Sequence, residues 1–233
     1  MTSRMSARFA RPATSHEPAR SRGRHLSVVR GLRGRMAWDR RRANFAGPVA
    51  DRLPEGATVL DMGCGDESMA RTLRRARPDL EITGLDVLPE PTTAIDAKEF
   101  DATTVPYDDH SFTAVTFVDV LHHTDDPMML LAEAARVASG RVVITDHLAD
   151  TRLARPQLCV MDWFCNGPFG VRLPPRYWTW AEWKRAFAAS DLVIDEVSTP
   201  LNGHAAPRSW LRDRGLDVLW TLAPLRRPAR RND

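Results

Sequence analysis

The sequence predicts an α/β protein whose mostly parallel, seven-stranded sheet carries helices on both faces and one antiparallel strand at its edge. Two observations support this prediction. Between residues 58 and 146, short apolar and β-branched segments alternate with segments of helical periodicity, which is the pattern of successive βαβ units. After residue 190, two further apolar segments are expected to be strands that pair antiparallel at the sheet edge.

The elements follow in order along the chain. A first helix is expected from Met36 to Leu53, and Pro54-Glu55-Gly56 ends it. Pro127 stands in the first turn of a later helix, where proline is tolerated, and Gly140 is expected to end that helix. The other expected helices are 67–77 and 180–190, and the expected strands are 58–61, 80–86, 98–101, 114–120, 141–146, 192–197 and 216–222.

The basic residues gather at the N-terminus. Residues 1–42 hold 12 arginines against two acidic residues, although the net charge of the whole chain is only +3. Residues 1–35 show almost no apolar periodicity, so we expect a disordered Arg-rich tail in front of a single domain, residues 36–233. A solvated extension is the simplest interpretation, and contact with nucleic acid or an anionic membrane, or an organelle transit peptide, remain open.

The cysteine content indicates a reducing compartment. Cys64, Cys159 and Cys165 are odd in number and show no C-x-x-C spacing, which favours neither a disulfide framework nor a zinc site. No apolar run approaches the ~18 residues that a membrane span needs. The N-terminus lacks the apolar stretch of a secretory signal. We therefore expect a cytoplasmic protein without a bound metal.

A glycine turn and a later acid point to a nucleotide-like cofactor. The first strand leads into Gly63-Cys64-Gly65, where the backbone can turn sharply and approach a ligand. Asp86 ends the second strand 21 residues later, a spacing at which an acid can accept both ribose hydroxyls. Dinucleotides and S-adenosylmethionine both fit this arrangement. The dinucleotide pattern requires a third glycine at position 68, which is Ser68 here, so S-adenosylmethionine is favoured.

Five segments in order resemble the class I S-adenosylmethionine-dependent methyltransferases, of the type 11 group that includes ubiquinone and menaquinone methylases. Residues 59–65 resemble the first motif of that family and residues 84–86 its ribose-binding acid. Residues 100–112 resemble the adenine-side segment, residues 119–127 the motif after the fourth strand, and residues 133–137 the helix before the fifth strand. The resemblance covers about residues 45–150 closely, and it implies a Rossmann-like doubly wound fold with S-adenosylmethionine as the cofactor.

The resemblance also implies a set of cofactor-binding residues. They lie at the first turn (Asp61, Gly63, Cys64, Gly65), at the ribose (Asp86, Val87), at the adenine (Asp101, Ala102) and at the methionine end (Asp119, Leu121). Two positions depart from the family pattern. Glu67 stands where the family usually has a glycine, and Thr113 where it often has an aspartate. Because of Glu67, a non-catalytic member of this fold that binds or regulates a partner remains an alternative.

The acceptor side of the site is less defined. His122, His123 and His147 are candidate bases for an acceptor hydroxyl, although in-line methyl transfer can proceed by positioning alone. His122 and His123 are adjacent and are expected to point to opposite faces, which argues against a shared metal ion. The aromatic segment 151–185 is either ordinary core or a lid over the substrate, and its candidate pocket residues are Trp163, Phe164, Phe169 and Tyr177.

We therefore expect methyl transfer from S-adenosylmethionine to an oxygen, carbon or nitrogen of a small apolar or aromatic acceptor. An RNA methyltransferase that binds nucleic acid through the Arg-rich tail is the second enzymatic alternative. The sequence does not distinguish the acceptor atoms from one another, and it leaves the oligomeric state open.

Overall fold

The computed structural model of the protein describes residues 41, 43–87, 89, 95–166, 177–199, 201 and 216–225, so the predicted tail 1–35 lies outside the described residues. Residues 43–50 are helical and are called the N-terminal helix. The strands are β1 (Thr58–Met62), β2 (Glu81–Asp86), β3 (Asp96–Glu99), β4 (Phe112–Val118), β5 (Ala138–His147), β6 (Leu192–Ser198) and β7 (Asp217–Pro224). The helices are α2 (Ser68–Ala76), η1 (Leu121–His123, a 3-10 helix), α3 (Pro127–Val137), α4 (Ala154–Asn166) and α5 (Trp180–Ala189).

All seven strands belong to one sheet in the order β3-β2-β1-β4-β5-β7-β6. β1 pairs in parallel with β2 and β4, β2 with β3, and β4 with β5. β7 is antiparallel to both of its neighbours, β5 and β6. The predicted α/β class with a mostly parallel seven-stranded sheet is confirmed. The antiparallel strand itself lies one place inside the edge, because β7 runs between β5 and β6.

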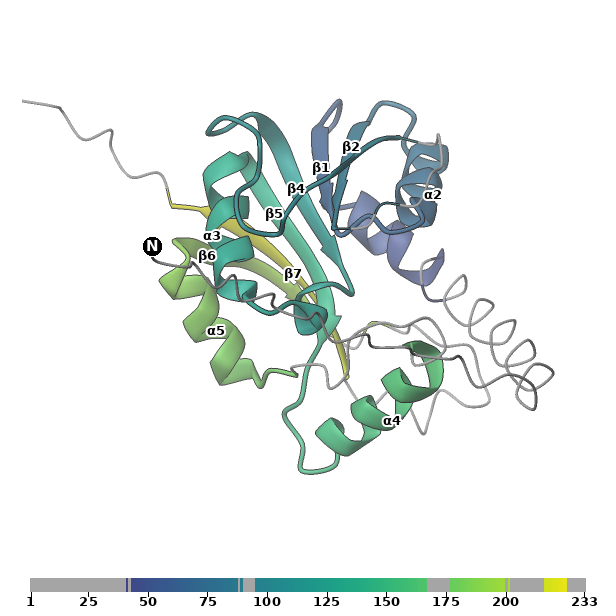
Figure 1. Ribbon diagram of the computed structural model, residues 1–233, viewed down its shortest axis with the longest axis vertical. Helices are drawn as coiled ribbons and strands as arrows, with labels where there is room; N and C mark the ends of the chain where they lie inside the picture. The colour runs from purple at the N-terminus through teal and green to yellow at the C-terminus, as the bar shows by residue number, and fades with distance from the viewer. Residues whose placement is uncertain are drawn as a thin grey trace, which may run out of the picture.

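Helices cover both faces of the sheet (Figure 1). The N-terminal helix and α2 pack on one face, where Phe45, Val49 and Leu73 belong to one apolar cluster. α3 and α5 pack on the other face in a second cluster. Successive residues of β1, Val59 and Leu60, belong to the two different clusters, because side chains alternate across a strand. The sheet is therefore doubly wound, and its strand ends are the place where a site can form.

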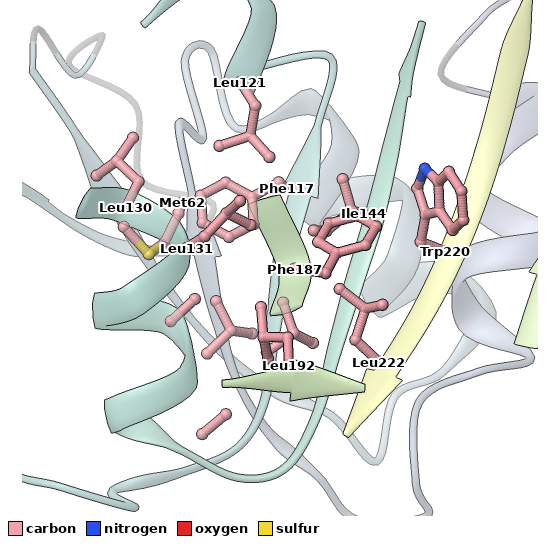
Figure 2. Close-up of a cluster of buried hydrophobic side chains, with 14 of the residues drawn as sticks. Met62, Phe117, Leu121, Leu130, Leu131, Ile144, Phe187, Leu192, Trp220 and Leu222 are labelled. Carbon is pink, nitrogen blue, oxygen red and sulfur yellow. The ribbon is translucent and has the colours of Figure 1, made fainter. Parts of the chain in front are cut away.

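The cluster under α3 and α5 is drawn in Figure 2. Phe187 of α5 lies between Trp183 and Trp220, with ring centroids 5.4 and 5.1 Å away. All three rings are at most 2% exposed. Burying side chains of this size contributes on the order of 1.5–3 kcal/mol each, so these rings anchor α5 to β7. Trp183, which lies in the predicted lid segment, is thus part of the core.

Both ends of α3 have a local cause. The Asp126 side chain accepts a backbone hydrogen bond at the start of the helix, and Pro127 occupies the first position. The helix ends at Val137, directly before β5. The prediction that Gly140 ends this helix is wrong, because Gly140 lies in β5. A Cβ on Gly140 would stand 2.6 Å from the carbonyl oxygen of Thr113, so the glycine is required by close approach of the neighbouring strand.

Helix α4 lies in the segment 151–185, where the sequence pattern predicts a helix only from residue 180. Pro156 stands in its first turn, where the missing N–H is tolerated. The role of this segment as a substrate lid stays a prediction. Among the described helices, none is both long enough and apolar enough to cross a membrane, and a cytoplasmic location stays a prediction.

Candidate functional site

The glycine turn between β1 and α2 begins the site. Gly63 and Gly65 have φ angles of 78° and 51°, in the left-handed region that favours glycine. A Cβ on Gly63 would stand 2.5 Å from the side chain of Val120, so Val120 closes directly on the turn. The backbone N–H groups of Gly63 and Cys64 donate to the carbonyl of Leu85 at 2.7 and 3.3 Å. The turn is therefore fixed between the end of β2 and the chain after β4.

Asp86, the last residue of β2, contacts this turn. Its Oδ2 accepts a hydrogen bond from the backbone N–H of Gly65 at 2.8 Å, across the 21 residues that separate them. The following residue, Val87, is 56% exposed. The structure thus brings the predicted glycine turn and the predicted ribose acid together at the carboxyl edge of the sheet.

Asp61, at the end of β1, and Cys64, within the turn, are both buried. The Oδ1 of Asp61 accepts a hydrogen bond from the hydroxyl of Thr116 in β4 at 2.8 Å. Burial, together with the negative charges of Asp61, Asp86 and Glu67, raises the pKa of the Cys64 thiol to about 12. Cys64 therefore stays a neutral thiol at physiological pH and is not a nucleophile.

Glu67 has a left-handed backbone conformation. Its φ is 55°, a left-handed value that costs a non-glycine residue roughly 1–2 kcal/mol. Its side chain is buried in the interior, and Oε2 accepts a hydrogen bond from the backbone N–H of Ile95 at 3.3 Å. The residue is therefore accommodated as a buried acceptor for the chain that enters β3.

Asp101 and Ala102 lie in the turn after β3. The Asp101 side chain accepts hydrogen bonds from Thr103 and from the backbone N–H of Thr104, and these bonds lower the pKa of Asp101. Ala102 has a φ of 55°. Because β3 runs parallel to β2, these residues follow the strand at the same carboxyl edge as Asp86. Asp101 is exposed there.

Asp119 follows β4 and is bound on both oxygens by Arg41. Nε and one terminal nitrogen of Arg41 donate to Asp119 at 2.6 and 2.7 Å. The same guanidinium donates to Asp217, the first residue of β7, at 2.9 and 2.8 Å. Burial alone would lower the pKa of Arg41, but the charges and hydrogen bonds of the two aspartates raise it well above its ordinary value. The guanidinium is thus permanently charged inside the protein.

His122 forms a buried pair with Asp146. Nδ1 of His122 lies 2.6 Å from Oδ1 of Asp146, and the same oxygen accepts the backbone N–H of His147 at 2.6 Å. Burial by itself would raise the pKa of Asp146, but His122 and His147 outweigh that effect and lower it. Because an ionised carboxylate only accepts hydrogen bonds, His122 carries a proton on Nδ1.

A second pair lies beside the first. Nδ1 of His147 is 3.0 Å from Oδ1 of Asp217. The rings of His122 and His147 are 4.8 Å apart, and the ring of Tyr177 lies 5.7 Å from each of them. His147 also accepts the indole N–H of Trp183 on its carbonyl oxygen at 3.1 Å. Two oriented imidazoles and a tyrosine therefore meet at the ends of β4, β5 and β7.

The remaining predicted site residues lie in different surroundings. Leu121 is buried in the core at the start of η1. The expectation that His122 and His123 point to opposite faces is wrong, because both lie in the 3-10 helix η1 and their rings are 4.0 Å apart. Trp163 lies on α4 and is 57% exposed. The side chain of Phe164 and all of Phe169 lie outside the described residues. In the described part of the chain, His, Cys, Asp and Glu side chains nowhere gather in a group that could hold a metal ion.

Sequence reasoning missed Arg41, Asp217 and the acid partner of His122. Arg41 stands between two other arginines next to the Arg-rich tail, so nothing local distinguishes it. Asp217 lies near the start of the expected strand 216–222, and nothing in its local sequence marks it as a partner of Arg41 or His147. Asp146 was recognised as the end of the fifth strand, and a His placed after β4 with an Asp at the end of β5 is the one signal from which the pair could have been inferred.

Comparison with known proteins places the chain in a family. The methyltransferase domain family matches residues 32–197. The ubiquinone/menaquinone biosynthesis C-methyltransferase UbiE of Desulfotalea psychrophila is 35% identical over 104 residues, which cover 40% of this chain and 42% of that protein. The ribosomal RNA small subunit methyltransferase G of Salinispora tropica is 49% identical over 65 residues, 26% of each chain. The chain thus spans less than half the length of these curated relatives.

A solved structure supports the fold. A chain of the complex between the Haloferax volcanii Trm112 methyltransferase activator and a methyltransferase matches with a TM-score of 0.62 at 21% identity, covering 89% of this chain and 100% of that one. The family match covers most of the sequence and includes the glycine turn, Asp86 and Asp119. The chain belongs to the class I S-adenosylmethionine-dependent methyltransferases.

Proposed function

We propose that this protein transfers a methyl group from S-adenosylmethionine to a hydroxyl group of a small apolar or aromatic molecule. The observation that carries the proposal is the hydrogen bond between Gly65 and Asp86, which joins the glycine turn to the acid at the end of β2. This hydrogen bond places backbone without a side chain beside a carboxylate, which is the arrangement that a ribose at the edge of a sheet requires.

The residues present fit the cofactor. Gly63 and Gly65 offer backbone without side chains, and Asp86 offers the ribose acceptor. Towards β4, Asp61 and Asp119 supply buried negative charge, which suits the cationic ammonium and sulfonium groups. Glu67 is turned into the interior and bonded to Ile95, so its position supports a catalytic member of the family over a non-catalytic one.

When bound, S-adenosylmethionine supplies an electrophilic methyl group on sulfur. The protein then has two tasks, to hold the acceptor in line with that group and to remove the proton of the acceptor. His122 is suited to the second task. Asp146 holds Nδ1–H, so the proton leaving an acceptor oxygen passes to Nε2, and the imidazolium that results is stabilised by the carboxylate of Asp146.

The choice of acceptor rests on the surroundings of His122. Tyr177 is 5% exposed and its ring lies nearly parallel to that of His122, at an angle of 24°. An oriented base next to an aromatic wall favours a phenol-like or other hydroxylated apolar acceptor. The quinone-pathway name of the Desulfotalea relative agrees with an aromatic acceptor, although that relative is named as a C-methyltransferase.

Calorimetry of the full chain with S-adenosylmethionine and S-adenosylhomocysteine tests the proposal. We expect both to bind in a one-to-one ratio with micromolar affinity, about −8 kcal/mol. Absence of heat with both ligands at millimolar concentration would contradict the proposal and favour the non-catalytic alternative. Salt-dependent binding of a ribosomal RNA fragment that deletion of residues 1–35 abolishes would instead favour an RNA acceptor, the class named for the Salinispora relative.

A further inference from the structure

Arg41 is buried at the carboxyl edge of the sheet and is bonded to two aspartates there. It is 5% exposed, and its four hydrogen bonds to Asp119 and Asp217 measure 2.6–2.9 Å. Its guanidinium also lies 4.5 Å from the centre of the Phe45 ring, one helical turn further on. Arg41, which is itself helical, is therefore bonded to residues 78 and 176 positions further along the chain.

Asp119 connects this arginine to the cofactor site. It has a φ of 57°, and its backbone N–H donates to the carbonyl of Thr145 at 2.9 Å. The next residue, Val120, is the one whose side chain closes on Gly63. A left-handed aspartate persists only where its surroundings determine it, and both of its carboxylate oxygens are held by Arg41. The residue that Arg41 holds on both oxygens is thus directly followed by the residue that packs on the glycine turn.

Stability alone is a weak reason for such a contact. A guanidinium enclosed with two carboxylates loses its hydration, and a buried ion pair is often no more stable than apolar residues of similar volume. Asp119, which Arg41 holds on both oxygens, directly precedes Val120, the residue that borders the glycine turn. A role in the cofactor site is therefore the stronger reason for the contact.

We propose that Arg41 is a positioning residue for the cofactor: by holding Asp119, it places the segment 119–120 against Gly63 and couples the N-terminal helix to cofactor binding. This inference rests on the proposed function. Arg41 itself contacts the two aspartates and acts on the cofactor only through them. The coupling predicts that the N-terminal helix becomes more ordered when the cofactor binds, because both favour the same arrangement of Asp119.

The chain offers a matched control at the other end of the same helix. Arg77 donates to the carbonyls of Ala50, Leu53 and Pro54 at 3.0–3.2 Å and to Asp79 at 2.7 Å. It therefore anchors the same helix at the amino edge of the sheet, away from Gly63. Arg77→Met should loosen the helix without touching Asp119.

The first experiment compares Arg41→Met and Arg77→Met by calorimetry with S-adenosylmethionine, after circular dichroism has established that each variant is folded. We expect Arg41→Met to bind about tenfold more weakly than the wild type, and Arg77→Met to stay within about twofold of it. Arg41→Lys keeps the charge but loses the fork that spans two carboxylates, so an intermediate affinity is expected. Equal affinities of Arg41→Met and Arg77→Met would overturn the inference.

The second experiment needs no variant. Amide hydrogen exchange of the wild-type full chain is measured with and without saturating S-adenosylmethionine. We expect residues 43–50 to gain protection on binding, and α5, on the opposite face, to change little. Cofactor binding that leaves residues 43–50 unchanged would overturn the coupling while the proposed function stands. If the wild type binds no cofactor at all, the proposed function and the inference fail together.

Discussion

The N-terminal helix is anchored by an arginine at each end, and the two anchors differ in almost every respect. At the carboxyl edge, Arg41 is buried with Asp119 and Asp217. At the amino edge, Arg77 is bonded to Asp79 and to backbone carbonyls, and 26% of its side chain is exposed. Backbone carbonyls need donors at the end of any helix, so Arg77 serves the fold. Buried carboxylates are not needed to end a helix, so their presence indicates that the carboxyl edge has a role beyond stabilising the fold.

The same contrast extends along the two edges. The carboxyl edge carries Asp86 on the glycine turn and the two His–Asp pairs, all brought together from different strands. The described contacts at the amino edge include the Thr58–Thr113 hydroxyl pair and the bond from Arg141 to the carbonyl of Arg52. Hydroxyls and carbonyls there join elements of the fold. In doubly wound sheets the ligand crevice lies at the carboxyl ends of the strands, as the charges indicate here.

The largest difference between the edges should appear in cofactor affinity. Asp86→Ala removes the carboxylate on the glycine turn, and we expect S-adenosylmethionine to bind at least about 100-fold more weakly, the loss of charge-assisted hydrogen bonds. Asp79→Ala removes an exposed carboxylate at the amino edge and should leave the affinity unchanged. Calorimetry of both variants measures the effect. Similar losses from the two substitutions would show that the carboxyl edge is not the cofactor site.

The free energy of unfolding should change less than the cofactor affinity, but a substitution at the carboxyl edge should again have a larger effect than one at the amino edge. Asp146→Ala leaves His122 Nδ1–H and the backbone N–H of His147 without their buried acceptor, which costs about 3 kcal/mol of unfolding free energy. Asp79→Ala should lower the urea midpoint far less, because water replaces the carboxylate there. Urea unfolding at pH 7 gives both values. A larger loss from Asp79→Ala would reverse the comparison.

Low pH should reduce the free energy of unfolding in part through protonation of Asp217 at the carboxyl edge. Burial alone would raise the pKa of Asp217, but Arg41 and His147 outweigh it and hold that pKa well below its usual range. An unfolded aspartate titrates near pH 3.9, so this contribution is complete above about pH 4 and is lost as the pH falls towards the folded value. Arg41→Met should therefore lose less unfolding free energy than the wild type between about pH 4 and pH 2, where the wild type begins to lose this contribution. Equal slopes would contradict the role given to Arg41.

The smallest effect is expected at Glu67. Glu67→Gly relieves the left-handed backbone, worth roughly 1 kcal/mol, and removes the hydrogen bond to Ile95, worth about as much. We expect unfolding free energy and S-adenosylmethionine affinity to change little, the latter by less than about threefold. A gain in affinity of tenfold or more would mean that Glu67 obstructs the cofactor and would favour a non-catalytic protein.

The elements that sequence reasoning predicted are those whose cause is local. The turn at Gly63 and Gly65 requires left-handed backbone, and Asp86 ends a strand at a fixed distance from it, so both were visible in the sequence. Helix α3 was predicted from its first turn, but its end was misplaced, because Gly140 is required by the carbonyl of Thr113 on the neighbouring strand. That contact depends on strand pairing, which no local pattern contains.

The missed residues are those whose role depends on distant partners. Arg41 is bonded to a residue 176 positions away, and the local sequence around it resembles the rest of the Arg-rich tail. His122 and His147 were candidates from their chemistry alone, and only the structure assigns a carboxylate to each. The fold could therefore be predicted almost completely, the meeting of the glycine turn with Asp86 as well, and the charged network behind them hardly at all.

A crystal structure of the full chain grown with S-adenosylhomocysteine tests the central claim most directly. The ribose hydroxyls are predicted to lie within hydrogen-bond distance of Asp86, with the backbone of Gly63 and Gly65 against the ligand and the amino-acid end next to the segment 119–120. Arg41 should still be bonded to Asp119. A ligand bound at the amino edge, or one that leaves Asp86 without a contact, would contradict the account.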